Sequence, residues 1–483
     1  MLHTINKEDW SIVFIFTTIC LSILVKSYFT YHGYLTSDSM SYLGSAQKLI
    51  DVSELSTENS LFSSKWPLGY PVLIYCVAKI TGLSVFWSSK ILNMLLVASI
   101  LIIFRFLFQK NAYLYGLIFF FSAYIEIFTY TWSESLFIYF IILFAASVYK
   151  ILTTQKTNFY MYFILFLSSL LLFLSRYIGV FSFIIIGLLG LYYLYKKDNS
   201  RAFVLILIAC LNILIMALYL HHNYMISGFI TGPRYSAPES NLQLFIALLK
   251  AIIAEMAIPI HRFGIESLIA ILFEFSILAF FVCRYKQSMK KAILNNRISI
   301  LAATFFIIGI FYILAIVSLR WVTFFDSYSF RLLAPGSFLI FIALIKYFTD
   351  ISSVKGKKII FRYIFILSSI SLLLFVPIRT IIKFDKEKGT YPTFQESILK
   401  KYKKVKAKSI VVDGSYHLTY LRSDIILEYT NQNESWTDFS KRINPNNKDV
   451  YIVIKKTNNN LITNGFISTL NQDYDDGELI KIN

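Results

Sequence analysis

The stretch that decides the fold class is AFVLILIACLNILIMALYL, residues 202–220, in which no residue is charged. At a rise of about 1.5 Å per residue, a helix of this length crosses the roughly 30 Å hydrocarbon core of a bilayer. The other runs that are long and apolar enough to span lie at 11–29, 86–108, 112–130, 134–151, 158–175, 178–195, 265–284, 298–318, 331–349 and 359–378. The sequence therefore predicts a mostly helical, polytopic membrane protein with about eleven transmembrane helices.

Two shorter apolar segments, 68–82 and 244–259, carry Pro, Lys or Glu. We expect them to form interfacial or re-entrant helices rather than full spans. The first run, 11–29, lacks a small-residue cleavage site, so we interpret it as an uncleaved anchor rather than a signal peptide.

The composition excludes an ordinary cytosolic enzyme, a disordered chain and a disulfide scaffold. The 483 residues are 57% hydrophobic and 15% charged, whereas soluble proteins have about 45–50% apolar and about 25% charged residues. The four cysteines lie far apart in apolar runs without a CxxC pair, so neither disulfides nor a zinc site is predicted.

The formal net charge of +18 would indicate a nucleic-acid ligand in a soluble protein. Here the basic residues gather in alternate loops, for example at 284–297 and 346–362. This pattern is the one that the positive-inside rule produces, so we predict no nucleic-acid partner. It predicts a multi-pass protein of the cell membrane with its N-terminus in the cytoplasm and its C-terminus outside.

Most acidic residues before the tail fall in the loops predicted to lie outside, and the long loops, 30–68 and 222–264, are also on that side. We therefore expect the chemistry at the outer face. In the first of these loops Met40, Leu43 and Ala46 recur at helical spacing, which predicts a short amphipathic helix on the membrane surface. Asp38 lies at its start, where Ser37 or Asp38 would serve as the helix N-cap. Spacing alone leaves a capping and a catalytic role for Asp38 open.

Beyond Thr380 polar residues dominate, so we divide the chain into a transmembrane catalytic domain, 1–380, and a soluble extracytoplasmic α/β domain, 381–483. Strands are predicted at Ser409–Val412, Asp424–Tyr429, Val450–Ile454 and Glu478–Ile482, with helices at Tyr416–Leu421, Ser435–Ile443 and Leu461–Leu470. The alternation predicts a small parallel sheet. We expect this domain to be non-catalytic and to serve either as a lid or as a module that docks the substrate that accepts the transferred group. The basic link at 400–408 would contact anionic headgroups or form a solvated helix.

Six short motifs occur in an order that resembles a known family. They are Asp38 with Tyr42, PLGYP at 67–71, TWSESLF at 131–137, SRYIG at 175–179, NY at 223–224 followed by TGPR at 231–234, and FRLLAP at 330–335. Over about residues 10–380 this series resembles the bacterial GT-C glycosyltransferases. These polytopic enzymes use polyprenyl-phosphate sugars and include protein O-mannosyltransferases and lipid A aminoarabinose transferases. Many of them carry two adjacent acids in the first loop. Here Ser39 follows Asp38, so a metal-bridging acidic pair is not predicted.

The resemblance implies an inverting transferase that moves a sugar from a polyprenyl-phosphate donor to an extracytoplasmic glycolipid, cell-surface polysaccharide or protein. Asp38 would be the base that takes the proton of the acceptor hydroxyl. Cations are needed to hold the leaving phosphate, and the candidates at the outer side are Arg176, Arg234, Arg331, Lys65, His261 and Arg262. Each of them would otherwise extend its side chain to the lipid headgroups.

Three further residues are candidates for contacts with the sugar. Glu134 opens a predicted span, so it would contact a sugar hydroxyl, lie just behind the residues that touch the substrate or interact with the helix dipole. Tyr42 and Tyr70 would line the sugar site or belong to the interfacial aromatic belt. No metal or cofactor is predicted, although a divalent cation remains open.

Two other functions remain as alternatives. A lipid-linked glycan ligase or polymerase would centre on a large late outer loop, whereas late loops such as 320–330 are short. A membrane transporter would show paired halves and broken helices at the midplane, and the two halves of this chain show no matching pattern.

Overall fold

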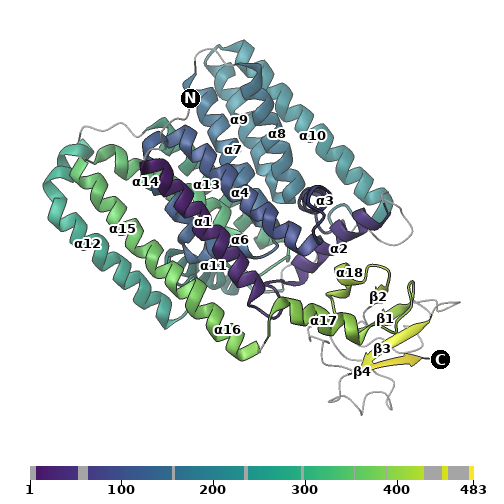
Figure 1. Cartoon of the computed structure of the whole chain (residues 1–483). Coiled ribbons are helices and arrows are strands. Elements are labelled where there is room, and N and C mark those ends of the chain that lie inside the picture. The colour runs from purple at the N-terminus through teal and green to yellow at the C-terminus, as the bar shows by residue number, and fades with distance from the viewer. Residues whose placement is uncertain are drawn as a thin grey trace, which may run out of the picture. The chain divides into compact units, whose positions relative to one another are not determined.

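The computed structural model describes residues 7–52, 64–154, 158–232, 238–294, 299–352, 354–387, 389–428, 449–454 and 478–482. Helices dominate this part of the chain (Figure 1). The chain divides into two compact units. The first unit comprises Met1–Lys26, Phe62–Tyr70 and Lys90–Ile382, and the second comprises Ser27–Leu61, Pro71–Ser89 and Lys383–Asn483. The second unit thus contains the tail predicted as a domain, together with two segments from near the N-terminus.

Long apolar helices form most of the first unit. They are α1 (Lys7–Tyr28), α4 (Val85–Phe108), α7 (Ser133–Thr153), α8 (Phe159–Ser175), α9 (Phe181–Tyr195), α10 (Asn199–Ser227), α12 (Ile265–Leu294), α13 (Ile300–Val322), α14 (Phe330–Ile351) and α15 (Val354–Leu373). Sequential neighbours pack against each other, as α7 does with α8, α9 with α10, and α13 with α14. The prediction of a mostly helical, multi-pass membrane protein is confirmed.

Within the described residues, eight helical segments are long and apolar enough to cross a membrane, fewer than the eleven predicted. Helix α8 is apolar but has 17 residues, and α12, which covers the predicted run 265–284, is not among the eight. The run 112–130 is divided into α5 (Ala112–Gly116), a 3-10 turn at Leu117–Phe120, and α6 (Ser122–Thr129). Phe121 is extended there, and the Ser122 N–H donates to the Ile258 carbonyl at 3.2 Å instead of continuing a helix.

Helices α13 and α14 approach each other at two glycines. A Cβ at Gly309 would lie 2.8 Å from the Gly336 carbonyl oxygen, and a Cβ at Gly336 would lie 2.9 Å from the Gly309 oxygen. Small residues permit this contact between backbones, which gives apolar helices in a membrane their packing energy. The crossing fixes α14, whose first turn carries Arg331.

The two short apolar segments are helical, as predicted: α3 is Gly69–Thr81 and α11 is Asn241–Met256. The predicted amphipathic helix of the first loop is α2 (Ser37–Val52), in the second unit. Its first helical hydrogen bond joins the Met40 N–H to the Thr36 carbonyl at 3.0 Å. Thr36 is therefore the N-cap, and Asp38 lies in the first turn rather than at the predicted cap position.

The tail contributes α17 (Tyr391–Lys401), α18 (Leu418–Leu421) and a sheet of β1 (Ile410–Val412), β2 (Ile426–Glu428), β3 (Val450–Ile454) and β4 (Glu478–Ile482), after the connecting helix α16 (Arg379–Glu387). The strand order is β2-β1-β3-β4. Strand β1 pairs in parallel with β2 and β3, but β4 is antiparallel to β3. The prediction of a wholly parallel sheet is therefore wrong at this edge, where mixed sheets commonly carry an antiparallel strand. The helices predicted at 435–443 and 461–470 lie outside the described residues.

In the second unit, the tail packs on the first loop. Helix α18 lies against α2, where the Thr419 hydroxyl donates to the Met40 carbonyl at 3.3 Å. A Cβ at Gly44 would lie 3.0 Å from the Thr419 side chain, so glycine permits this close contact. At the other end of the loop, the Tyr31 N–H donates to the Glu387 carboxylate at 2.8 Å.

Candidate functional site

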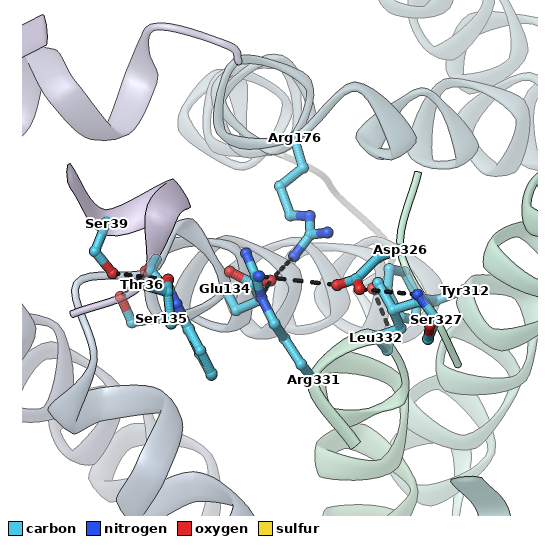
Figure 2. Close-up of polar contacts among 11 residues, drawn as sticks. Thr36, Ser39, Glu134, Ser135, Arg176, Tyr312, Asp326, Ser327, Arg331 and Leu332 are labelled. Carbon is cyan, nitrogen blue, oxygen red and sulfur yellow. Dashed lines mark hydrogen bonds and ion pairs between the residues drawn. The ribbon is translucent and has the colours of Figure 1, made fainter. Parts of the chain in front are cut away.

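A buried carboxylate, Glu134, forms the centre of the candidate site in the first unit. It lies in the first turn of α7, directly after the extended residues that end at Trp132. Its side chain is 0% exposed and forms ion pairs with Arg176 and Arg331 (Figure 2). The Nε of Arg331 also donates a hydrogen bond to the Oε1 of Glu134. A carboxylate buried to this extent is stable only when it is paired, and two guanidinium groups provide the pairing. We call these three residues the Glu134 centre.

The two arginines come from different helices. Arg176 follows the last residue of α8, and Arg331 lies in the first turn of α14. Their side chains are 15% and 12% exposed, so both are more accessible to solvent than the Glu134 carboxylate that they share. Arg331 also stacks on the Trp132 ring at 4.5 Å. It lies 3.8 Å from Asp326, and Figure 2 marks this contact with a dashed line. The centre thus presents two guanidinium groups, and their ion pairs with Glu134 fix their orientation.

The segment before α3 is tied to the same unit and carries Lys65, which is exposed. The Nζ of Lys65 lies 5.2 Å from the Trp66 ring, and the Tyr177 hydroxyl donates to the Ser64 carbonyl at 2.7 Å. Gly232, with φ +76°, packs on this segment so closely that a Cβ would lie 2.8 Å from the Lys65 Cα. The predicted motif at 231–234 therefore meets Lys65, although Arg234 itself lies outside the described residues.

His261 belongs to a second buried group of charges. Its Nε2 lies 2.5 Å from Oε2 of Glu126, and Arg379 pairs with Oε1 of the same carboxylate at 2.7 Å. The Lys26 ammonium donates to the Phe375 carbonyl at 2.7 Å and adds positive charge near Glu126. The His261 ring also packs edge-on against Phe330, 4.3 Å away, next to Arg331 in the chain. The two groups of charges are therefore connected through this aromatic contact.

The other predicted residues differ in how far their side chains are exposed. Arg262, next to His261, is exposed. Tyr42 is buried within α2 at 2% exposure, and Asp38, also on α2, is half-buried. Tyr70 is fully buried and donates to the Asn93 side chain at 3.0 Å. Of the nine predicted site residues that the structure describes, three are joined in direct contact within the first unit: Glu134, Arg176 and Arg331.

Sequence patterns did not single out Glu126, Arg379 and Lys26 of the second group, nor two buried polar residues of α4, Lys90 and Asn93. Lys90 and Asn93 are fully buried within the apolar helix α4. An ionisable residue within a membrane-spanning run is itself a signal of function, and Lys90 provided that signal. Among the described residues no group of three or more His, Cys, Asp or Glu side chains is arranged to hold a metal ion.

No model of a known protein family matches the chain, and no curated protein matches its sequence. Its fold is similar to that of ArnT from Cupriavidus metallidurans bound to undecaprenyl phosphate, with a TM-score of 0.61, 11% identity, and coverage of 99% of this chain and 98% of that chain. The same protein in its apo state aligns with a TM-score of 0.50 and 10% identity over 97% of each chain. The GT-C-like fold predicted from the motifs is confirmed.

Proposed function

We propose that this chain is an inverting membrane glycosyltransferase that moves a sugar from a polyprenyl-phosphate donor to an extracytoplasmic acceptor. The observation that carries the proposal is the Glu134 centre, because it fixes two arginines around one buried carboxylate. Support also comes from the fold, which is similar to that of a protein crystallised with undecaprenyl phosphate.

The arginines are suited to the phosphate of the donor. A guanidinium carries five N–H donors in a plane, so it is able to bond to Glu134 and to a phosphate oxygen at the same time. Bonds to a phosphate become stronger as its negative charge grows, which favours departure of the leaving group. Glu134 is 0% exposed, so we assign it the role of counter-ion that holds Arg176 and Arg331 in place. Lys65 and Arg234 are further candidates for the same phosphate.

The reaction is a single displacement. The acceptor hydroxyl oxygen bonds to the anomeric carbon while the bond from that carbon to the phosphate oxygen breaks. Polyprenyl phosphate leaves with the electron pair, and the hydroxyl proton passes to the Asp38 carboxylate. One displacement inverts the anomeric configuration, and one base is sufficient because the phosphate is already a good leaving group.

The test is the Asp38→Asn substitution, assayed as sugar transfer from a series of labelled polyprenyl-phosphate sugars in membranes. Because Thr36 is the N-cap, the charge of Asp38 contributes about 0.3–1 kcal/mol to α2 through the helix dipole, and the helix should persist in the Asn variant. Loss of a general base lowers rates by about 10²–10⁴. The matched control is Asp51→Asn near the other end of α2, where the carboxylate accepts a hydrogen bond from Gln47 at 2.9 Å. If the Asp38→Asn variant retains as much activity as the Asp51→Asn control, Asp38 is not the base.

The class of acceptor needs a separate experiment in cells. A deletion strain and its complemented parent should be compared by mass spectrometry of lipopolysaccharide, wall polymer and glycoproteins. We expect one of these fractions to lose the mass of one sugar, and complementation with the Asp38→Asn variant should not restore it. An unchanged mass in all three fractions would contradict transfer to a cell-surface acceptor.

A further inference from the structure

Asn93 occupies a position in the first unit that the proposed mechanism does not use. It is fully buried in α4 and makes four hydrogen bonds, which is the full capacity of an amide side chain. Its Nδ2 donates to the carbonyls of Phe128 and Tyr130, both at 2.9 Å. Its Oδ1 accepts from the Ser135 hydroxyl at 2.8 Å and from the Tyr70 hydroxyl at 3.0 Å.

Lys90 lies one turn earlier on α4 and acts on the same stretch. Its Nζ donates to the Thr129 carbonyl at 2.7 Å and to the Thr131 hydroxyl at 3.1 Å. Residues 128–130 include the last residues of α6, whose carbonyls have no partner further along the helix. In an apolar interior such carbonyls need another donor. Helix α4 therefore provides donors to three successive carbonyls.

The stretch held in this way leads directly into the Glu134 centre. Asn93 bonds to Tyr130 before it and to Ser135 after it, so Trp132 and Glu134 lie between two fixed points. Trp132 is the ring on which Arg331 stacks. A displacement of this stretch would move the counter-ion and the stacking surface of the arginine together.

The same amide also reaches the segment that carries Lys65. Tyr70 is the second residue of α3 and lies five positions after Lys65. Its hydroxyl and that of Ser135 both donate to the Oδ1 of Asn93. One side chain thus joins the Lys65 segment to the stretch that holds Glu134. We infer that Asn93 is a positioning residue that fixes the Lys65 segment relative to the Glu134 centre and so sets the affinity for the lipid phosphate. The inference rests on the proposed function, since it assumes that both elements contact the donor.

The test compares two buried asparagines in the purified full chain. Asn93→Leu removes all four hydrogen bonds and keeps the number and branching of the side-chain heavy atoms. The matched control, Asn212→Leu, removes a fully buried amide that donates to Ser169 at 2.7 Å and lies on α10, a helix that contributes no residue to the Glu134 centre. The probe is undecaprenyl phosphate, and the readouts are its Kd and the melting temperature. We expect Asn93→Leu to weaken binding at least tenfold and Asn212→Leu to lower only the melting temperature.

A second pair of variants keeps the inference testable if Asn93→Leu does not fold. Tyr70→Phe removes one hydroxyl and Asn93→Asp keeps the acceptor oxygens but loses both donors. Each should weaken binding a few-fold, and their combination should weaken it by less than the product, because both act through one network. Unchanged affinity in every folded Asn93 variant would overturn the inference. An Arg176→Ala, Arg331→Ala double variant is measured alongside. If that variant binds like the wild type, the proposed donor site fails, whatever the Asn93 variants show.

Discussion

Replacing Glu134 by glutamine should destabilise the protein strongly although the two side chains have almost the same size. The substitution removes the negative charge from between Arg176 and Arg331 and leaves the two guanidinium groups facing a neutral amide. Removing one partner of a buried ion pair costs about 3–5 kcal/mol. The arginines are 15% and 12% exposed, so water is able to reach them in part, and we expect a loss of about 3 kcal/mol. At about 2 °C per kcal/mol for a large domain, the melting temperature should fall by about 6 °C.

The assay is thermal unfolding in detergent at a fixed scan rate, since membrane proteins unfold irreversibly and the midpoint depends on the rate of heating. The matched control is Asp9→Asn. Asp9 pairs with Arg105 at 2.8 Å, and the two side chains are 33% and 37% exposed, so its removal should cost less than that of Glu134.

A second substitution separates charge from packing. Arg176→Gln in the Glu134→Gln background removes one of the two uncompensated cations. The double variant should therefore be more stable than Glu134→Gln alone, with a coupling of about 1 kcal/mol or more. A Glu134→Gln midpoint within 1 °C of the wild type, or a double variant that loses the sum of the two single losses, would refute the role of Glu134 as counter-ion.

Three other predictions concern donor binding, pH dependence and topology. Arg331→Ala should weaken binding of undecaprenyl phosphate about ten- to a hundredfold, because it removes a charge-assisted bond of about 1.5–3 kcal/mol. Arg331→Lys should restore part of the affinity, and equal Kd values for the wild type and both variants would mean that Arg331 does not contact phosphate. Burial and the nearby charge of His32 lower the pKa of His417 to about 3, so the unfolded chain takes up a proton below about pH 6.5 that the folded chain does not. Stability should then fall by about 1.4 kcal/mol per pH unit from pH 6.5 towards 3, and unfolding midpoints between pH 7.5 and 4.5 should show a smaller decline in His417→Phe. Cysteine labelling from outside the cell should modify a site near Asn433 but not one near Lys290, and the reverse pattern would invert the predicted topology.

The three residues of the Glu134 centre could be predicted from the sequence as site residues, but the contacts between them could not. Arg331 and Glu134 are 197 positions apart, and the order of the motifs contains no distance between them. Their contact depends on how α7, α8 and α14 pack, which is determined by close approaches such as that of Gly309 to Gly336. Hydropathy cannot indicate such approaches because glycine contributes to them through its small size.

The same limit explains the difference in the number of spans and the residues that were missed. Composition does not distinguish a continuous helix from one that stops at Phe121, since the residues on both sides are equally apolar. Lys90 and Asn93 bond mainly to backbone carbonyls, which every residue possesses. The side chains of residues 128–130 therefore give no indication in the sequence that the carbonyls of these residues bond to α4. The fold of α2, by contrast, was predictable because its apolar spacing is local.

The packing of the tail on the first loop has a consequence for how the protein is made. The hydrogen bond between Thr419 and Met40 joins residues 379 positions apart. At a synthesis rate of about 5–20 residues per second, the helix that carries Asp38 waits about 20–75 s for its partner. During that time its contact surface around Gly44 has nothing to pack against from the tail, and a chain that ends before Thr419 never acquires the contact. Premature termination or proteolysis before Thr419 should therefore remove a contact from the helix that carries the proposed base, so that the environment of a residue near the beginning of the chain depends on synthesis of its last part.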